Sequence, residues 1–259
     1  MLPAQRRSAI VEFVDHDGGV RITDLVDRFG VSEITIRRDI DHLSALGLLE
    51  RVHGGAMALH RAKGASGFRS RSSRCAVEKR AIAEMAAELV RPGGSIGISG
   101  GTTTYELATA ICAVPDLTVV TNSVPVAQLL HRAATPGQVV VLTGGVRTES
   151  DVLGGPVAVE AVRSMQFDLL FISAHGVDFE AGLTTNDLVE AETNRALVDR
   201  ARRTCVLADH SKFGVIGVRT FLDLTQAHLL VTDSGVPAAA RTALSQAISD
   251  LRVASTTGQ

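Results

Sequence analysis

The sequence contains no tryptophan, one tyrosine and only 3% aromatic residues among its 259 positions. Apolar residues still make up 45% of the chain, so a sizeable core can form, and that core must be aliphatic. Long apolar runs are also missing: none approaches the length that spans a bilayer, and the first residues lead into an amphipathic pattern, not a secretion signal. We therefore expect a cytoplasmic protein with no membrane partner.

Cysteine is equally scarce. The three cysteines, Cys75, Cys112 and Cys205, form no CxxC pair and no spacing typical of metal ligands. We expect reduced thiols that act as small core residues of an intracellular protein, and we expect no metal and no cofactor.

A net charge of −2 gives no overall sign of a nucleic-acid partner. The charge is unevenly distributed, however: residues 1–60 have a net charge of −2, residues 61–80 of +6 and residues 81–259 of −6. DNA affinity would have to come from a few local side chains, and it would fall steeply with salt. These side chains are Arg37, Arg38, Arg51, His53, Arg61, Lys63, Arg69, Arg71 and Arg74.

Residues 31–43, read at 100° per residue, predict a helix with two unlike faces. Ile36, Ile40 and Leu43 form a narrow apolar stripe suited to a small core. Ser32 is a good N-cap, and Glu33 places negative charge in the first turn, where the helix dipole favours it. The opposite face has Ile34, Thr35, Arg38, Asp41 and His42, with Arg37 at the border.

The segments around this helix predict a winged helix-turn-helix. A first helix is expected over residues 3–16, and Thr23 can cap a second, short helix. Gly30 then supplies the tight turn, with a positive φ, and residues 48–55 alternate like a small β-ribbon. The alternative interpretation is a packing or dimerisation module whose charged face is merely solvated.

Residues 1–55 resemble the N-terminal domain of the DeoR family of bacterial transcriptional regulators. The resemblance rests on Arg28-Phe29-Gly30-Val31-Ser32-Glu33, on Thr35-Ile36-Arg37-Arg38-Asp39, and on Gly47-Leu48-Leu49 followed by Arg51-Val52-His53-Gly54-Gly55-Ala56. It implies a domain that binds double-stranded operator DNA.

Helix geometry predicts a role for each exposed residue of this domain. Thr35, Arg38 and His42 should face base edges, and the capping Ser32 is expected to contact DNA beside them. Ile34 is available for a thymine methyl group. Arg37, Arg51 and His53 should contact phosphates. For Asp39 and Asp41 we expect local pairing with arginines of the same helix.

Residues 60–75 are rich in Arg, Ser and Gly and have no apolar period, which is typical of a linker. Its positive charge can aid solubility or follow the DNA backbone. The predicted organisation is a DNA-binding domain over residues 1–58, a basic flexible linker over 59–75 and a second domain over 76–259.

Short apolar runs alternate with helical patterns from residue 76 onward, which predicts a Rossmann-like parallel α/β sheet with both faces covered. Strands are expected at residues 95–99, 117–121, 139–143, 169–174, 204–208 and 228–232. Helices are expected at residues 77–90, 102–111, 124–133, 156–164, 188–202 and 237–246.

Ligands of such sheets bind at the carboxyl ends of the strands, and here those ends are rich in small, hydroxyl and charged residues. The first predicted strand runs into Gly100-Gly101-Thr102-Thr103-Thr104, a glycine turn that opens a helix and suits an anion. It is neither a Walker A loop nor a GxGxxG fingerprint, which argues against a nucleotide. The composition favours a phosphorylated polyhydroxy ligand, although ordinary loop chemistry is the competing explanation for each end alone.

The second domain is similar to the C-terminal sensor domain of the DeoR family. The matching segments are Ser99-Gly100-Gly101-Thr102-Thr103-Thr104, Val119-Val120-Thr121-Asn122-Ser123, Leu142-Thr143-Gly144-Gly145, Gly182-Leu183-Thr184-Thr185 and Asp209-His210-Ser211-Lys212-Phe213-Gly214. The resemblance implies a fold like that of ribose-5-phosphate isomerase and a sugar-phosphate effector. It also implies an effector site formed by Ser99, Gly100, Gly101, Thr102, Thr103, Asn122, Gly145, His175, Gly182 and Lys212.

Three positions depart from the family pattern: Ser99 and His175 stand where aspartate is usual, and Asn194 stands where lysine is usual. Two carboxylates are therefore missing at the predicted site. A more negatively charged effector, one without the usual sugar hydroxyls, or a sensor that has lost its ligand would each fit this change.

The sequence thus predicts a transcriptional regulator, expected to be a repressor controlled by a phosphorylated sugar or related metabolite. The alternative is a sugar-phosphate isomerase with an N-terminal appendage. Such an enzyme needs a positioned base, usually a carboxylate, so the substitutions at Ser99 and His175 count against it, and we expect no enzyme. A protein-interaction module is the third interpretation. The family resemblance also implies a homodimer or homotetramer.

Overall fold

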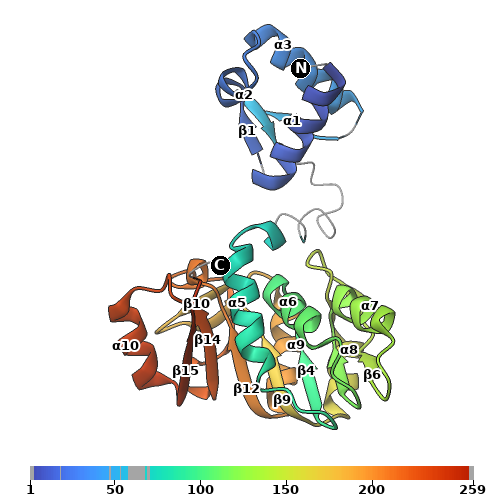
Figure 1. The fold of residues 1–259 in the computed structure, drawn as a ribbon, viewed down its shortest axis with the longest axis vertical. Helices are drawn as coiled ribbons and strands as arrows, with labels where there is room; N and C mark the ends of the chain where they lie inside the picture. The colour runs from blue at the N-terminus through green and yellow to red at the C-terminus, as the bar shows by residue number, and fades with distance from the viewer. Residues whose placement is uncertain are drawn as a thin grey trace. The chain divides into compact units, whose positions relative to one another are not determined.

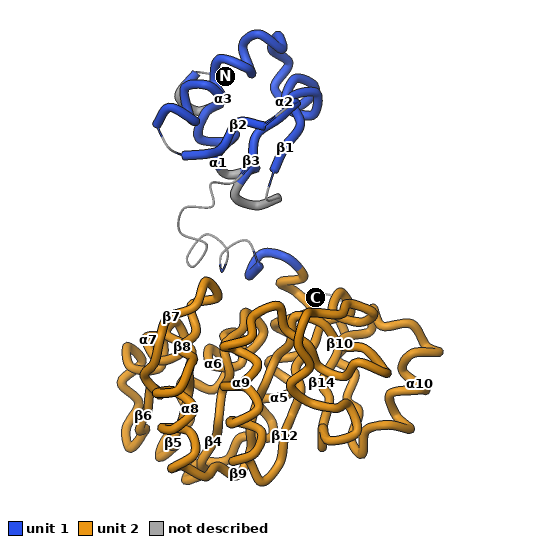
Figure 2. The backbone as a smooth tube through the Cα atoms, turned by 180° about the vertical axis from the view of Figure 1, so that it is seen from behind, with its two compact units in different colours: residues 1–74 blue, residues 75–259 orange. Residues whose placement is uncertain are grey.

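The computed structural model describes residues 3–17, 19–46, 48–52, 54–57, 68 and 71–256. The chain divides into two compact units, Met1–Arg74 and Cys75–Gln259, coloured separately in Figure 2. Most of the predicted linker, residues 59–67, 69 and 70, lies outside the described residues, and residues 71–73 are helical. The predicted domain boundaries at residues 58 and 75 stay predictions.

Within residues 3–57, the described part of the N-terminal unit combines three helices with a small antiparallel sheet (Figure 1). In chain order its elements are α1 (Pro3–Asp17), β1 (Gly19–Arg21), α2 (Ile22–Phe29), α3 (Glu33–Ala45), β2 (Glu50–Val52) and β3 (Gly55–Met57). The predicted ribbon is confirmed as the β2–β3 hairpin. The sequence did not reveal β1, which pairs with β3, because a three-residue strand shows no periodicity.

The predicted cap and turn of α3 are both confirmed. The Ser32 hydroxyl accepts a hydrogen bond from the Thr35 amide at 3.2 Å, and Gly30 has a φ of 62°. The predicted cap of α2 was wrong: α2 begins at Ile22 with Arg21 in the N-cap position, and the Thr23 hydroxyl hydrogen-bonds to Asp24. The apolar core of this unit has no exposed surface at Ile10, Val14, Ile36 and Leu49.

A buried ion pair joins α1 to α3. Arg6 Nε lies 2.6 Å from Asp39 Oδ2, and Arg7 Nε lies 3.7 Å from the other carboxylate oxygen. Arg6 and Asp39 are each only 7% exposed. The expectation that Asp39 pairs within its own helix was therefore wrong, because its partners come from α1 across the small core.

The C-terminal unit is built on the predicted parallel sheet. Its seven strands lie in the order β15-β14-β12-β9-β4-β5-β6, with every neighbouring pair parallel. They are β4 (Ser95–Ile98), β5 (Thr118–Thr121), β6 (Val139–Leu142), β9 (Phe167–Ile172), β12 (Ala201–Leu207), β14 (Leu229–Asp233) and β15 (Asp250–Ala254). The six predicted strands are all present. The sequence did not reveal β15, because its charged residues interrupt the apolar run.

Six helices cover the two faces of the sheet (Figure 1). They are α5 (Ala76–Ala87), α6 (Thr102–Ile111), α7 (Val124–Ala133), α8 (Pro156–Arg163), α9 (Leu188–Asp199) and α10 (Ala238–Ala247). Residues of α5, α6 and α7 share one apolar cluster with the sheet, and residues of α8, α9 and α10 share the other. All six helices were predicted.

The strand order reverses beside β4. The chain runs from β4 to β5 and β6 in one direction and then returns to place β9, β12, β14 and β15 in the other. The loops after β4 and β9 therefore leave in opposite directions, and open α/β sheets bind ligands between two such loops. We call this region, at the carboxyl ends of β4 and β9, the crevice.

Two short antiparallel sheets lie outside the main one. The first has the order β10 (Gly176–Asp178), β11 (Gly182–Thr185), β13 (Arg219–Leu222), and the second is the ribbon β7 (Val146–Arg147) and β8 (Leu153–Gly154). Two 3₁₀ turns, η1 (His210–Lys212) and η2 (Leu224–Gln226), complete the unit. Strands this short gave no periodic signal in the sequence. Among the described residues, no helix has the length and hydropathy needed to cross a membrane.

The buried ion pair yields a stability prediction. Replacing Asp39 by alanine leaves the Arg6 guanidinium buried without its partner, so we expect the N-terminal unit to lose about 3–5 kcal/mol of unfolding free energy. Hydrogen exchange of the α1 and α3 amides, followed by mass spectrometry on the whole chain, measures this. The control is Glu33→Ala, which breaks an exposed pair with Arg37 and should cost less than about 1 kcal/mol. Equal losses in the two variants would contradict the prediction.

Candidate functional site

The exposed face of α3 presents the residues that the sequence assigned to DNA. Arg38 and His42 are exposed, and Ile34 is 64% exposed. Thr35 is half-buried, and its hydroxyl lies 2.8 Å from that of Ser32. Ser32 therefore caps the helix, and its predicted contact with DNA stays a prediction.

Two of the three arginines predicted to contact DNA from α3 and β2 are already paired with carboxylates. Arg37 Nη2 lies 2.6 Å from Glu33 Oε1, one turn earlier on α3, and Arg51 on β2 binds Asp41. Asp41 was expected to pair within its own helix, and that was wrong because the wing supplies its arginine. For Arg38, the structure records no ion pair among the described residues.

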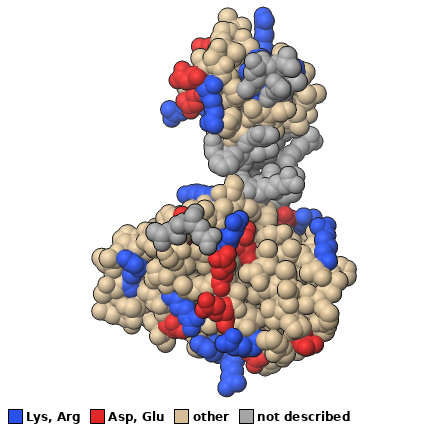
Figure 3. Space-filling view, viewed as in Figure 1, with Lys and Arg blue, Asp and Glu red and all other residues tan. Residues whose placement is uncertain are grey.

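The surface charge of the N-terminal unit agrees with these two arginine–carboxylate pairs. On the face shown in Figure 3, acidic and basic side chains of the N-terminal unit lie next to one another instead of forming a continuous basic surface. A face whose cations are paired in this way would neutralise few phosphates. His53, the other predicted phosphate contact on the wing, lies outside the described residues.

A groove of ≈ 800 Å³ in the N-terminal unit lies elsewhere, between α2 and the small sheet. Arg28 covers the Phe13 ring there, with 3.9 Å between the guanidinium carbon and the ring centroid. None of the predicted site residues lines this groove, and its size alone does not indicate a ligand.

In the C-terminal unit, two serines tie together the loops that follow β4 and β9. The Ser173 amide donates to Ser99 Oγ at 3.2 Å, and the Ser173 hydroxyl donates to the Gly100 carbonyl at 3.2 Å. Ser99 is 1% exposed. The neutral hydroxyl that replaces the usual carboxylate thus holds the two sides of the crevice together. Ser173 was not predicted, although its position directly after β9 was a signal.

Asn122, at the end of β5, fixes the same loop from its other side. Its Oδ1 accepts a hydrogen bond from the Gly100 amide at 3.0 Å, and its Nδ2 donates to the Leu153 carbonyl at 3.3 Å. The Gly100 amide is therefore engaged, so it is not one of the donors free for an anion. Asn122 is 1% exposed and acts by positioning the loop.

Close packing explains the two glycines before α6. A Cβ atom on Gly100 would lie 1.6 Å from Val152 Cγ1, and one on Gly101 would lie 2.1 Å from the Ser173 hydroxyl oxygen. Only glycine lets this backbone pass between β9 and the β7–β8 ribbon. The ribbon's Val152 was not predicted as part of the site, because nothing in the sequence indicates that it returns to cover Gly100.

Thr102 and Thr103 are the first two residues of α6, with 9% and 3% of their surface exposed. No hydrogen bond from either hydroxyl is recorded among the described residues, and neither oxygen is one of the fully buried atoms without a partner, so both stay open to a ligand or to water. The first amides of a helix also lack partners within the helix. Two hydroxyls and these amides together form a donor set for an anion such as phosphate.

His175 and Lys212 follow β9 and β12, two neighbouring parallel strands whose carboxyl ends lie at the same edge of the sheet. His175 follows β9 and is exposed; its Nε2 lies 3.1 Å from Asn186 Nδ2, and its amide donates to the Thr184 carbonyl at 3.0 Å. Lys212 ends the turn η1 and is half-buried. Asn186 was not predicted, and the sequence gave no signal for it beyond its place after β11.

Backbone geometry accounts for the two remaining predicted residues. Gly145 has a φ of 115°, and a Cβ atom there would lie 2.6 Å from the Gly154 carbonyl oxygen. Gly182 has a φ of 72° at the start of β11, where a Cβ atom would lie 2.4 Å from the Leu222 carbonyl oxygen. These contacts require glycine without any ligand, and we leave Gly182 outside the site proposed below.

Both units match known family models. Residues 6–62 match the DeoR-like helix-turn-helix domain, and residues 74–234 match the DeoR C terminal sensor domain. The chain belongs to the DeoR family.

Relatives match along nearly the whole chain. A putative aga operon transcriptional repressor from Escherichia coli O157:H7 is 31% identical, with 91% of this chain and 88% of the relative covered. The HTH-type transcriptional regulator GlpR of Haloferax volcanii is 35% identical, with 93% and 94% covered. Ribose 5-phosphate isomerase from Plasmodium falciparum overlaps 54% of each chain with a TM-score of 0.39 and 13% identity, which is too partial to assign a chemistry.

The Asp41–Arg51 pair generates a prediction about salt dependence. In Asp41→Asn the arginine is released to reach a phosphate, so the slope of log K against log salt should steepen by about 1 and non-specific affinity should rise. Fluorescence anisotropy of a labelled duplex at several salt concentrations measures both quantities. Glu160→Gln, which releases Arg163 on α8, is the matched control and should leave the slope unchanged. An unchanged slope in Asp41→Asn would refute the assignment of Arg51.

Proposed function

We propose that this protein is a cytoplasmic transcriptional repressor that binds double-stranded operator DNA through α3 and is controlled by a phosphorylated sugar or a related phosphorylated metabolite. The observation that supports it most is the combination, in one chain, of a winged helix-turn-helix with an exposed Arg38 and a helix start whose Thr102 and Thr103 hydroxyls have no recorded partner among the described residues.

On the DNA side, α3 would lie in the major groove. Arg38 would donate to a guanine edge, His42 would contact the neighbouring base, and Ile34 would pack on a thymine methyl group. Arg37 and Arg51 would then contact the backbone, each shared with its carboxylate. Relatives named as repressors and regulators along nearly the whole chain support this role.

On the effector side, the phosphate would bind at the start of α6 through Thr102 and Thr103, with Lys212 supplying positive charge. Ser99, Gly100, Gly101, Asn122 and Gly145 would shape the crevice, and His175 would face the part of the ligand away from the phosphate.

An isomerase is the less favoured alternative. Abstraction of a proton next to a carbonyl requires a base, and the two carboxylates usual at this crevice are replaced by Ser99 and His175. The nearby Asp151 is engaged in an ion pair, with Arg147 Nε 2.8 Å from its Oδ1. We propose a binding site and no catalytic step.

A homodimer or homotetramer would match this function, because a two-fold symmetric regulator reads a symmetric operator with half-sites one or more helical turns apart. Sedimentation of the protein alone and with DNA tests this part of the proposal.

The DNA-binding proposal is tested by gel shift on genomic fragments that include the promoters of the protein's own and neighbouring genes. We expect one fragment to be retained over the others in a salt-sensitive way, and Arg38→Ala should cost about 1–3 kcal/mol of specific binding. The control is Arg132→Ala, an exposed arginine on α7, which should change nothing. The proposal fails if no fragment is preferred, with or without phosphorylated sugars.

The effector proposal is tested by thermal shift with ribose 5-phosphate, fructose 1-phosphate, glucose 6-phosphate, glycerol 3-phosphate and inorganic phosphate. Thr103→Val keeps the side-chain volume and removes one hydroxyl, so it should weaken binding of the best compound about 3- to 10-fold. The control is Thr109→Val, farther along the same helix, whose hydroxyl donates to the Tyr105 carbonyl. Equal binding in the two variants would exclude Thr103 from the phosphate site.

A further inference from the structure

The main sheet of the C-terminal unit has two edge strands, β6 and β15, at opposite ends of the strand order (Figure 1). An edge strand presents unpaired backbone N–H and C=O groups that can bind a further strand. Proteins usually protect such an edge with charged side chains, proline or a bulge. The two edges of this sheet differ in that protection.

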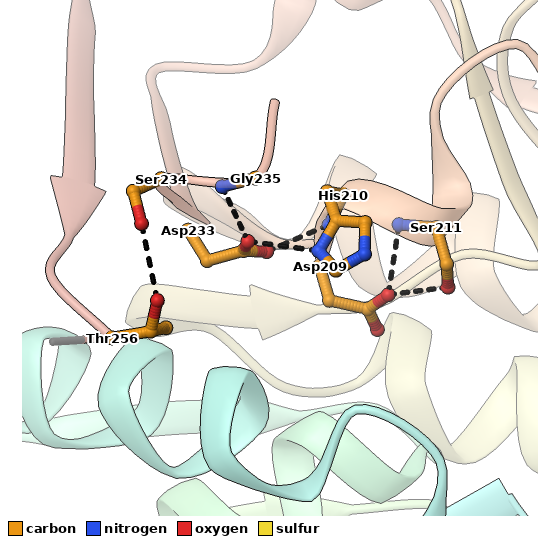
Figure 4. A network of polar contacts seen from close by, with 7 residues as sticks. All are labelled: Asp209, His210, Ser211, Asp233, Ser234, Gly235 and Thr256. Atoms are coloured by element: carbon orange, nitrogen blue, oxygen red, sulfur yellow. Dashed lines mark hydrogen bonds and ion pairs between the residues drawn. The ribbon is translucent and has the colours of Figure 1, made fainter. Parts of the chain in front are cut away.

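Charged and polar groups protect β15. The strand contains Asp250 and Arg252, which pair with each other, with 3.2 Å between Arg252 Nη2 and Asp250 Oδ2. Just beyond its carboxyl end, the Thr256 hydroxyl lies 3.1 Å from the hydroxyl of Ser234, the residue after β14 (Figure 4). A further strand on this edge would have to desolvate the ion pair, which is costly.

The other edge strand, β6, has none of these protections. No charged residue stands between Arg132 and Arg147 in the sequence, and this stretch contains the whole of β6. The strand has no proline, and its register with β5 is regular. Among the described residues, no strand pairs with its outer edge. The backbone groups on this edge are therefore open to a partner.

Exposed aliphatic side chains gather around β6. Val139 is 53% exposed and Leu142 is 41% exposed, and Val146 is exposed after the turn that follows the strand. Val157, at the start of α8, is exposed on the same surface, because a Cβ atom on Gly144 would lie 3.8 Å from its Cγ1 atom. An apolar surface beside an unpaired strand edge is typical of an interaction site.

The hydrogen bonds of β6 show which backbone groups face outward. The amides of Val139 and Thr143 donate to carbonyl groups of the β5 segment, at 2.9 and 3.0 Å. Successive residues of a strand direct their backbone groups to opposite sides. The N–H and C=O groups of Val140 and Leu142 therefore face away from the sheet.

We propose that β6 is a dimer interface, at which two copies of this chain pair β6 with β6 in antiparallel orientation and continue the main sheet across a two-fold axis. The inference deepens the homodimer or homotetramer of the proposed function and rests on that part of it. Val140 pairs with Leu142 of the partner subunit, and the reverse pair follows by symmetry. Each pair exchanges two hydrogen bonds, and the axis passes beside Val141.

A second copy suits this surface better than an unrelated partner. At a two-fold axis each residue lies near its own copy, so a charged side chain there would meet a like charge. The stretch between Arg132 and Arg147 contains no charge, and its aliphatic side chains can pack against their own copies. The outward N–H and C=O groups are complementary to themselves once the strand is reversed. A two-fold dimer also matches a symmetric operator.

The first test removes the outward hydrogen-bond donor of Leu142. Proline at this position deletes an N–H group that has no partner within the sheet, and its ring faces the partner strand. We expect Leu142→Pro to raise the dissociation constant of the dimer at least about tenfold, because two of the interface hydrogen bonds are lost. Sedimentation equilibrium measures the constant, and far-UV circular dichroism checks that the fold is kept.

The matched control is the same change on the other edge. The Ala254 carbonyl on β15 accepts from the Ser234 amide at 3.2 Å, so the neighbouring Val253 directs its amide outward. Val253→Pro should leave the dissociation constant unchanged. Added salt should not weaken the wild-type dimer either, because the interface contains no ion pair.

Disulfide formation tests the register and does not depend on a proline. In the proposed pairing, Val141 faces its own copy with about 4.5 Å between the Cα atoms, within the range of disulfides. Val141→Cys should link to itself under mild oxidation, as mass spectrometry of the joined peptide shows. Val139→Cys is the control: its Cα atoms lie about 13 Å apart, too far for a bond, although Val139 is the more exposed residue.

The outcomes separate the interface from the proposed function. A wild-type oligomer in which Val141→Cys forms no bond to its own copy, or which Leu142→Pro weakens no more than Val253→Pro does, overturns the β6 pairing and leaves the proposed oligomer standing. Equal linking of Val139→Cys and Val141→Cys also overturns it, because the contact would then have no fixed register. A wild-type protein that sediments as a monomer refutes both the pairing and the proposed oligomer.

Discussion

The reversal of strand order beside β4 is the constraint on which the C-terminal unit depends. Because the chain fills one side of β4 with β5 and β6 and the other with β9, β12, β14 and β15, the loops after β4 and β9 must diverge. The Ser99–Ser173 and Ser173–Gly100 hydrogen bonds limit that divergence. They fix the spacing between the start of α6, with the hydroxyls of Thr102 and Thr103, and the arm that contains His175.

Much of this arrangement could be predicted from the sequence. The periodicity of apolar residues predicts six of the main strands and the six helices that cover them. Local residue chemistry predicts the Ser32 cap and the Gly30 turn. The contacts between distant segments could not be predicted, because they depend on packing. Nothing in the sequence indicated that Asp39 reaches Arg6, that Arg51 reaches Asp41, or that Val152 covers Gly100.

The candidate effector site was likewise predicted in part. Residues of the Ser99–Thr103 loop do lie at the crevice, but Asn122 and the two glycines of that loop act by positioning and close packing. Ser173 and Asn186 were missed because single polar residues after short strands are common in any sequence. The residues of a loop indicate which chemical groups it offers, whereas the fold decides which residues those groups contact.

The paired arginines of the N-terminal unit have a consequence at the level of the whole chromosome. Non-operator DNA is in large excess and binds part of the regulator non-specifically. The bound fraction grows with the number of phosphates that unpaired lysine or arginine side chains neutralise. In the proposed repressor, keeping Arg37 and Arg51 on carboxylates would lower that background occupancy. Fewer copies per cell would then keep one control region filled, and a modest drop in affinity would empty it.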